Sequence, residues 1–105
     1  MSFGIIGAGA FGTALAVSLS GKYPEVILWG RDKAHMCNLQ MHRENSRYLP
    51  GTVLPAALKP TADINQAAAQ QTLLLAIPMQ TLRQLVEDHA GLFKGETLVA
   101  CSKGI

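Results

Sequence analysis

Short, unbroken runs of apolar residues limit what this chain can fold into more than any other feature of its sequence. They cover residues 3–6, 26–29, 73–77 and 98–101. Runs of this length that do not alternate with polar residues are typical of strands buried on both faces, as in a parallel sheet. Because parallel neighbours are joined by crossover connections, helices are expected between the runs. The sequence therefore predicts an α/β fold with a doubly wound parallel sheet.

Helix signals occupy the segments between these runs. Helices are expected over residues 10–20, 32–43, 67–69 and 82–89. The first would end near Gly21, a common stop signal, and Asp32 is suited to cap the second. Asp63, followed three residues later by Gln66, predicts a capping box at the start of the third.

Two segments depart from this regular alternation. Residues 44–61 contain Pro50-Gly51, Pro55 and Pro60. Because proline cannot donate to a central ladder, we expect a loop there, with one short edge strand at 58–61. The chain stops at Ile105, directly after a predicted buried strand. We therefore expect a chain truncated after about the fifth strand, whose uncovered apolar face would favour association.

Composition excludes several classes of protein. With 105 residues, of which 49% are hydrophobic, the chain is long enough for one domain with a core and too short for two. A net charge of +2 is too small for a general nucleic-acid binder. The apolar runs fall short of the roughly 20 residues that span a bilayer. Cys37 and Cys101 lie far apart, and no leader precedes the first run, which favours a reduced cytoplasm.

Residues 7–12, GAGAFG, match the pattern G-x-G-x-x-G. They follow a predicted strand and open a predicted helix, within a unit of about 30 residues, as in the Rossmann-type dinucleotide-binding fold. Gly7 would form the tight turn, Gly9 would admit the pyrophosphate, and Gly12 would let the helix approach the strand. The alternative is an ordinary glycine-rich turn. Phe11 would pack against the cofactor or, alternatively, in the core.

The end of the second apolar run bears on the choice between NADPH and NADH. An acidic side chain there would bind the ribose diol, whereas a basic one suits a 2′-phosphate. Arg31 comes first and can bind a phosphate through two hydrogen bonds or stack on adenine. Asp32 is expected to cap the following helix instead. NADPH is therefore favoured, with NADH kept open and a solvated surface arginine as the alternative for Arg31.

Five segments carry a closer resemblance: GAGAFGTALA, VILWGRD, NSRYLPG, LLLAIPMQTLRQLV and LVACSKGI. In order and spacing they resemble the amino-terminal part of bacterial NAD(P)-dependent glycerol-3-phosphate dehydrogenase, over essentially all 105 residues. The glycine turn is generic, whereas W-G-R-D, N-x-R-Y-L-P-G and S-K-G are specific to this family. The resemblance implies an enzyme that interconverts dihydroxyacetone phosphate and sn-glycerol 3-phosphate, mainly to supply the backbone of glycerophospholipids.

The resemblance also adds residues to the site. Ala10 and Phe11 match the pair that contacts the cofactor after the second glycine, and Arg31 matches a residue near the adenosine end. Lys103 matches a lysine that touches both the nicotinamide side and the substrate. A cation at the carboxyl end of a buried strand can hold a phosphate or polarise a carbonyl, although a solvated loop lysine is the alternative.

Two further residues complete the expected site. Pro78 follows the third apolar run, where its fixed φ would shape the turn at the cofactor edge. Tyr48 would flank the cofactor or, equally, anchor its loop. The expected cofactor-binding residues are thus Gly7, Gly9, Ala10, Phe11, Gly12, Arg31, Tyr48, Pro78 and Lys103, of which Lys103 would also bind the substrate.

Two departures from the family pattern matter. Many members have a serine where this chain has Ala10, so one hydroxyl to the pyrophosphate is lost. The family's proton-transferring lysine and its substrate-phosphate residues lie in a later helical domain. We therefore interpret residues 1–105 as the NAD(P)-binding part alone, with no catalytic acid or base, and leave a homodimer of the complete enzyme open.

Other constellations are weaker. His35, Cys37 and His42 lie close in sequence, but no fourth ligand is evident, which disfavours zinc. His89 continues a predicted apolar helix face, and Cys101 ends a buried run, so structural roles are expected for both. Rival functions are another reductase of the same fold, such as ketopantoate reductase or another hydroxyacid-type reductase, and a nucleotide-sensing module without chemistry.

Overall fold

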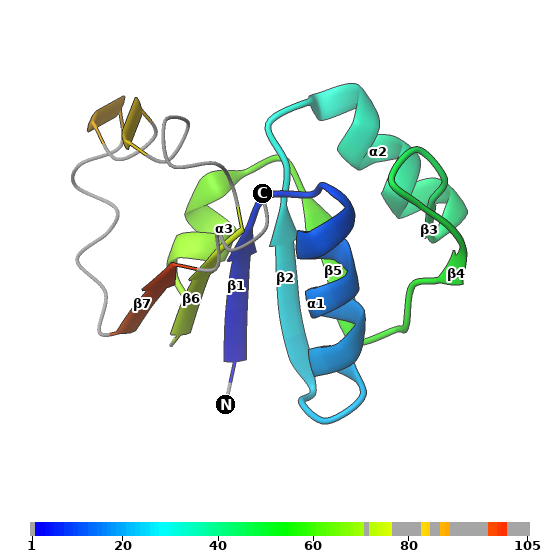
Figure 1. The fold of residues 1–105 in the computed structure, drawn as a ribbon, viewed down its shortest axis with the longest axis horizontal. Helices are drawn as coiled ribbons and strands as arrows, with labels where there is room; N and C mark the ends of the chain where they lie inside the picture. The colour runs from blue at the N-terminus through cyan, green and yellow to red at the C-terminus, as the bar shows by residue number, and fades with distance from the viewer. Residues whose placement is uncertain (1, 71, 77–82, 85–86, 89–96, 101–105) are drawn as a thin grey trace.

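The computed structural model describes residues 2–70, 72–76, 83–84, 87–88 and 97–100. Within them, one sheet has the strand order β5-β2-β1-β6-β7 (Figure 1). The strands are β1 (Ser2–Ile6), β2 (Glu25–Trp29), β5 (Leu58–Thr61), β6 (Thr72–Leu75) and β7 (Thr97–Ala100). All four neighbouring pairs are parallel. The parallel sheet predicted from the apolar runs is confirmed, and its order is that of the Rossmann fold.

Helices cover both faces of this sheet. They are α1 (Ala10–Ser20), α2 (Lys33–His42) and α3 (Ile64–Ala68). In Figure 1, α3 lies behind β1, whereas α1 lies in front of β5. Val26 and Leu28 of β2 belong to the hydrophobic cluster that includes side chains of α1 and α2. Ile27 and Trp29 belong to the opposite cluster, with Ile64 of α3. Two buried faces explain why this strand reads as an unbroken apolar run.

The segment after α2 differs from the expectation of a loop. Residues 44–53 form an antiparallel hairpin of β3 (Glu44–Asn45) and β4 (Leu49–Val53), with an irregular register. Gly51 has a φ of 85°, and its N–H donates to Glu44 Oε2 at 2.9 Å. A two-stranded sheet tolerates the proline of β4, because such strands are edges. The expected edge strand at 58–61 is confirmed as β5.

Aspartate caps begin α2 and α3. Asp32 Oδ1 accepts from the N–H groups of Ala34 and His35, at 3.0 and 3.2 Å, which confirms the predicted cap. Asp63 Oδ1 accepts from the N–H of Asn65 at 3.0 Å, so Asp63 caps α3 as expected, although the helix ends at Ala68. The predicted capping box is wrong, because the N–H of Asp63 donates to Thr61 Oγ1 at 3.0 Å instead of to Gln66.

Arg43 joins α2 to the segment that leads to β5. It ends the helix with a φ of 54°, in the left-handed region. Its Nη2 donates to the carbonyl oxygen of Leu58 at 2.7 Å, and also to those of Leu54 and Pro55. One side chain therefore supplies donors for three carbonyl groups of an irregular stretch.

The carboxyl end of the chain is described only in part. The predicted helix over 82–89 lies largely outside the described residues, although Gln84 Nε2 donates to Asp88 Oδ1 at 3.1 Å, one turn further on. Across the part that the structure describes, no helix is both long enough and apolar enough to cross a bilayer.

Candidate functional site

The glycine turn, residues 7–12, connects the carboxyl end of β1 to α1. Gly7 has a φ of 121°, which side-chain-bearing residues rarely adopt, and its N–H donates to the carbonyl of Trp29 at 2.8 Å. A Cβ on Gly12 would overlap Gly7 O and lie 3.3 Å from Ala76 Cβ. The turn role predicted for Gly7 and the close-packing role predicted for Gly12 are therefore confirmed.

At Gly9, neither backbone conformation nor crowding accounts for the glycine. Its φ of −80° and ψ of −166° are open to any residue, and a Cβ built on it would have no neighbour within 4 Å. Within the described part of the chain, a side chain could therefore be accommodated at this position. Open space beside the backbone is what a ligand that approaches Gly9 closely would need.

The amino terminus of α1 lacks the caps of the other two helices described. Gly9 offers no side chain, and the first turn contains no acidic residue. The first N–H groups of a helix have no acceptor within the helix, and the helix dipole adds positive charge there. Ala10 and Phe11 border this end, and Phe11 is 43% exposed, which excludes the alternative of a core aromatic. The arrangement favours an anion.

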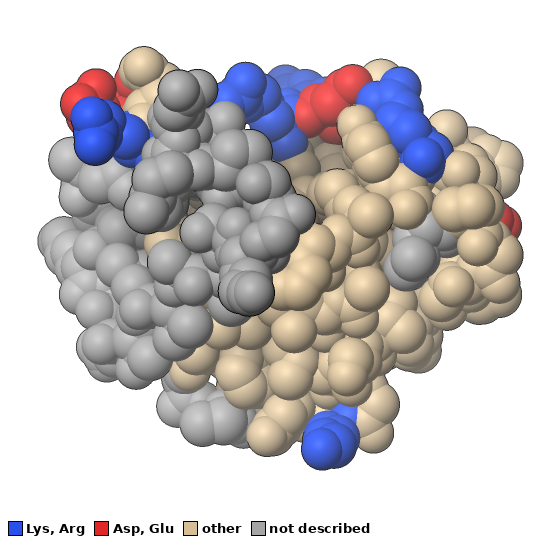
Figure 2. All heavy atoms as spheres, in the orientation of Figure 1, with Lys and Arg blue, Asp and Glu red and all other residues tan. Residues whose placement is uncertain are grey.

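Arg31 stands on the same edge of the sheet. It is exposed and follows β2 after Gly30. In Figure 2, lysine and arginine side chains gather along the upper edge, towards which β1 and β2 point, with acidic side chains between them. Because the Asp32 carboxylate already accepts from two N–H groups of α2, it is engaged as a helix cap. The positive side chain is therefore the one left for a ligand.

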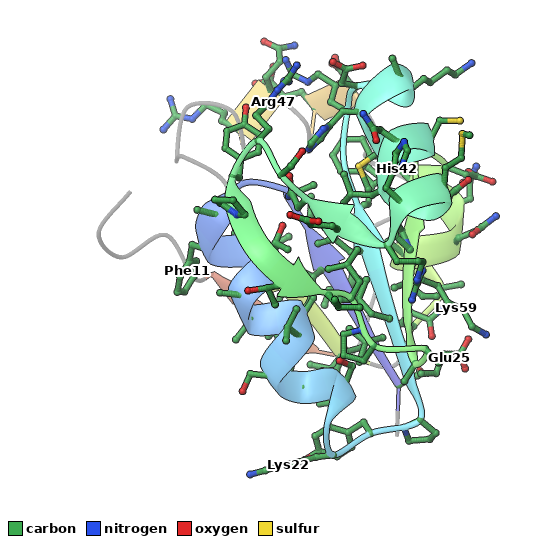
Figure 3. All side chains as sticks on the ribbon, turned by 90° about the vertical axis from the view of Figure 1, so that its right-hand side faces the viewer. Phe11, Lys22, Glu25, His42, Arg47 and Lys59 are labelled. Atoms are coloured by element: carbon green, nitrogen blue, oxygen red, sulfur yellow. The ribbon has the colours of Figure 1, made fainter. Side chains whose placement is uncertain are left out.

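Tyr48 lies in the turn between β3 and β4. Its ring contacts the ring of His35 on α2 edge-on, with centroids 5.5 Å apart, and the Arg47 guanidinium lies 5.8 Å from its centroid. These contacts agree with a loop anchor, yet the side chain is still 44% exposed. In Figure 3, Arg47 lies at the top of the molecule, above the hairpin, and Phe11 lies at the left edge beside α1.

Two hollows flank α2. A pocket of about 240 Å³ lies beside the hairpin turn. It is lined by Asp32, Ala34, His35, Asn38, Leu39, Ser46 and Arg47. A second pocket, of about 510 Å³, lies between α2 and the end of β5. It is lined by Lys33, Met36, Cys37, Gln40, Thr61, Ala62 and Asp63. The first pocket is the one that shares the hairpin turn with Tyr48.

Asn45 connects the hairpin to the glycine turn, and we assigned it no role from the sequence. Its side chain is fully buried. Asn45 Nδ2 donates to the carbonyl of Ala8 at 3.0 Å and to Thr13 Oγ1 at 2.7 Å. Asn45 Oδ1 accepts from the N–H of Tyr48 at 3.3 Å. The only sequence signal was its place in N-x-R-Y-L-P-G, because the residues it donates to lie 37 and 32 positions away.

Several residues named from the sequence lie outside the described part: Pro78 and Lys103 of the expected site, together with His89 and Cys101. Among the residues that are described, no three His, Cys, Asp or Glu side chains gather as metal ligands would. Gly7, Gly9, Ala10, Phe11, Gly12 and Arg31 lie at the carboxyl ends of β1 and β2, where parallel sheets bind ligands.

Comparisons with known proteins agree with this arrangement. The family model described as NAD-dependent glycerol-3-phosphate dehydrogenase N-terminus matches residues 2–105. Glycerol-3-phosphate dehydrogenases (NAD(P)+) of Ruegeria sp. (strain TM1040) and Roseobacter denitrificans are 50% and 49% identical over 105 residues, which is 100% of this chain and 32% of each relative. The crystal structure of glycerol-3-phosphate dehydrogenase from Coxiella burnetii superposes with a TM-score of 0.86 at 29% identity, over 94% of this chain and 31% of that one.

The chain thus spans about a third of the length of these relatives. Neither a ketopantoate reductase nor a nucleotide-sensing module is favoured by these matches. The family model covers all but the first residue. The chain therefore belongs to the NAD-dependent glycerol-3-phosphate dehydrogenase family and corresponds to the amino-terminal part of its members.

Proposed function

We propose that residues 1–105 form the cofactor-binding part of a glycerol-3-phosphate dehydrogenase and bind NADPH at the glycine turn, with NADH as the weaker ligand. One observation carries this proposal: α1 begins, without a capping side chain, directly after a glycine whose Cβ direction is open. In a member of this family, that combination is suited to a dinucleotide pyrophosphate.

The residues present fit such a cofactor. The free N–H groups at the start of α1 can donate to the pyrophosphate, and the absence of an acidic residue in that turn avoids repulsion. Ala10 has no side-chain donor, so it would contribute only its backbone N–H. Phe11, exposed beside this turn, would cover part of the cofactor. Pyrophosphate binding would therefore depend on backbone N–H donors. A side-chain substitution leaves these donors in place and can affect them only by moving the turn.

The adenosine end supports NADPH over NADH. Arg31 is exposed after β2, and its guanidinium can donate two hydrogen bonds to a 2′-phosphate. Asp32 is committed to capping α2, so its carboxylate is poorly placed to serve as the ribose ligand that NAD-specific sites employ. Tyr48, nearly half exposed, would flank the cofactor from the hairpin turn.

The reaction we propose for the complete enzyme is the interconversion of dihydroxyacetone phosphate and sn-glycerol 3-phosphate, for glycerophospholipid synthesis. The nicotinamide supplies hydride chemistry when it is bound. Lys103 would hold the substrate, Pro78 would shape the turn after the third apolar run, and no residue of this chain would act as acid or base. We place the enzyme in the cytoplasm because its chain carries two cysteines without a disulfide pattern, and we leave its oligomeric state, such as a homodimer, to measurement.

Calorimetric titration of the folded chain tests the cofactor proposal, with folding checked first by circular dichroism. NADPH should bind more tightly than NADH, and 2′-phospho-AMP, which carries only the adenosine end, should bind measurably. If a folded chain binds none of the three, the proposed function is wrong.

The substrate proposal is tested on a chain that continues to the length of the relatives. We expect NADPH oxidation in the presence of dihydroxyacetone phosphate and none with ketopantoate. The opposite preference would assign the chain to a different reductase.

A further inference from the structure

We propose that Asn45 is a positioning residue that holds the peptide between Ala8 and Gly9 in the orientation needed to bind a pyrophosphate. The proposal rests on the proposed function, because it concerns the same glycine turn. It assigns to the hairpin a task that neither the G-x-G-x-x-G pattern nor the family match specifies. In this view, β3 acts on the cofactor site through the turn and does not contact the cofactor.

The contacts of Asn45 converge on the turn from outside it. Its side chain has no exposed surface, and both of its donor hydrogens are used, on the carbonyl of Ala8 and on Thr13 Oγ1. Thr13, one turn into α1, is also fully buried. Ala8 O can only accept, so the nitrogen of the Asn45 amide must face it. The hairpin, the turn and the helix therefore meet at one buried amide.

Because a peptide bond is planar, the hydrogen bond from Asn45 to Ala8 O also fixes the direction of the Gly9 N–H. The chain described contains no cis peptide, so the Ala8 carbonyl and the Gly9 N–H point in opposite directions. When Asn45 holds Ala8 O inward, the Gly9 N–H is directed away from Asn45. If this peptide turned over, the carbonyl oxygen would take the place of that N–H and would repel an anion.

The turn needs such a restraint because of its glycines. Gly7 and Gly9 flank Ala8, and glycine reaches conformations that other residues do not. Among the described residues, no atom lies within 4 Å of the Cβ position of Gly9 to block movement on that side. Because the turn must stay open to a ligand on its exposed side, its orientation has to be fixed from the buried side, where Asn45 donates to Ala8 O.

The test compares two ligands on the full chain. NADPH requires the turn, whereas 2′-phospho-AMP requires only the adenosine end. Asn45→Ala should raise the Kd for NADPH at least about tenfold, the scale of one hydrogen bond to an anion, and leave that for 2′-phospho-AMP within about twofold. Asn65→Ala is the matched control, because Asn65 is exposed and, within the described part of the chain, its side chain bonds to the Asp63 carboxylate alone. It should change neither affinity.

Thr13 supplies a milder second pair of variants, should Asn45→Ala fail to fold. Thr13→Val keeps the shape but removes one acceptor of the Asn45 amide, while Thr13→Ser retains it. We expect Thr13→Val to weaken NADPH binding and to leave 2′-phospho-AMP binding unchanged. Thr13→Ser should bind NADPH as the unsubstituted chain does. In the ligand-free protein, the side-chain amide hydrogens of Asn45 should exchange slowly with solvent and faster in Thr13→Val.

The outcomes separate this proposal from the one on which it rests. If the unsubstituted chain binds neither ligand, the proposed function fails. Suppose instead that the unsubstituted chain binds both ligands. If the variants then weaken both affinities equally, or weaken neither, Asn45 has no positioning role at the turn and the proposal is overturned. A selective loss of NADPH, with 2′-phospho-AMP spared, supports it.

Discussion

The carbonyl oxygen of Gly7 occupies the space that a Cβ atom on Gly12 would need. The contact joins the two ends of the glycine turn, so α1 can start this close to β1 only with a glycine at residue 12. Gly12→Ala should lower the free energy of unfolding by about 1–3 kcal/mol, the usual cost of overpacking, as measured by urea denaturation.

Gly21→Ala is the control for that substitution. Of the residues that the structure describes, Ser18 alone would meet a Cβ at Gly21, through its carbonyl oxygen at 3.5 Å, and the φ of −76° suits alanine. This variant should be as stable as the unsubstituted chain or more stable by about 0.4–1 kcal/mol. Equal destabilisation by both alanines would show that crowding at Gly12 is not the reason for the glycine.

Arg31 should determine the preference between the two cofactors. Arg31→Ala removes a charged donor that only a 2′-phosphate would use, so the Kd for NADPH should rise by about ten- to a hundredfold while that for NADH changes little. Lys22→Ala removes the same charge and should leave both affinities unchanged, because Lys22 precedes the amino end of β2 whereas Arg31 follows its carboxyl end (Figure 3 shows Lys22 at the bottom). Equal losses for NADPH and NADH in Arg31→Ala would contradict a role in reading the 2′-phosphate.

Asp32 should behave as a helix cap. Asp32→Ala leaves the N–H groups of Ala34 and His35 without their acceptor and should cost about 1 kcal/mol of stability. Asp32→Ser keeps a capping oxygen, so it should retain most of the stability. NADH affinity, measured by calorimetry, should stay within about twofold in Asp32→Ser, because capping does not involve the ribose. A large loss of NADH affinity there would identify Asp32 as a cofactor ligand.

Arg43 combines a left-handed backbone with hydrogen bonds to three carbonyl groups. Arg43→Ala loses those bonds and keeps the backbone strain, whereas Arg43→Gly loses the bonds but relieves the strain. Both variants should be less stable than the unsubstituted chain in urea denaturation, and the glycine variant should be the better of the two by about 1 kcal/mol. If the two are equally unstable, the backbone conformation of Arg43 is not under strain.

The parts of the fold predicted from the sequence depend on local signals. The apolar runs, the cap at Asp32 and the end of α1 before Gly21 each involve residues close together in the chain. The hairpin at 44–53 was missed because Pro50 and Gly51 indicate a loop by themselves. The pairing is stabilised by contacts with distant segments, such as those of Asn45 with Ala8 and Thr13.

In the candidate site too, local sequence signals were read correctly and contacts between distant segments were missed. The spacing of Gly7, Gly9 and Gly12, followed by Arg31, was sufficient to place these residues together at one edge of the sheet. Asn45 could not be found in this way, because its role is visible only once β3 is packed against the turn. The capping box at Asp63 failed for a related reason, since Thr61 Oγ1 reaches the N–H that Gln66 was expected to satisfy.

NADPH is proposed to bind at the uncapped start of α1. Amide chemical shifts of the folded chain, recorded while NADPH is added, test it most directly. We predict the largest changes at Gly9, Ala10, Phe11 and Arg31. Changes confined to the pocket lined by Lys33, Cys37 and Gln40, with the start of α1 unaffected, would contradict the claim.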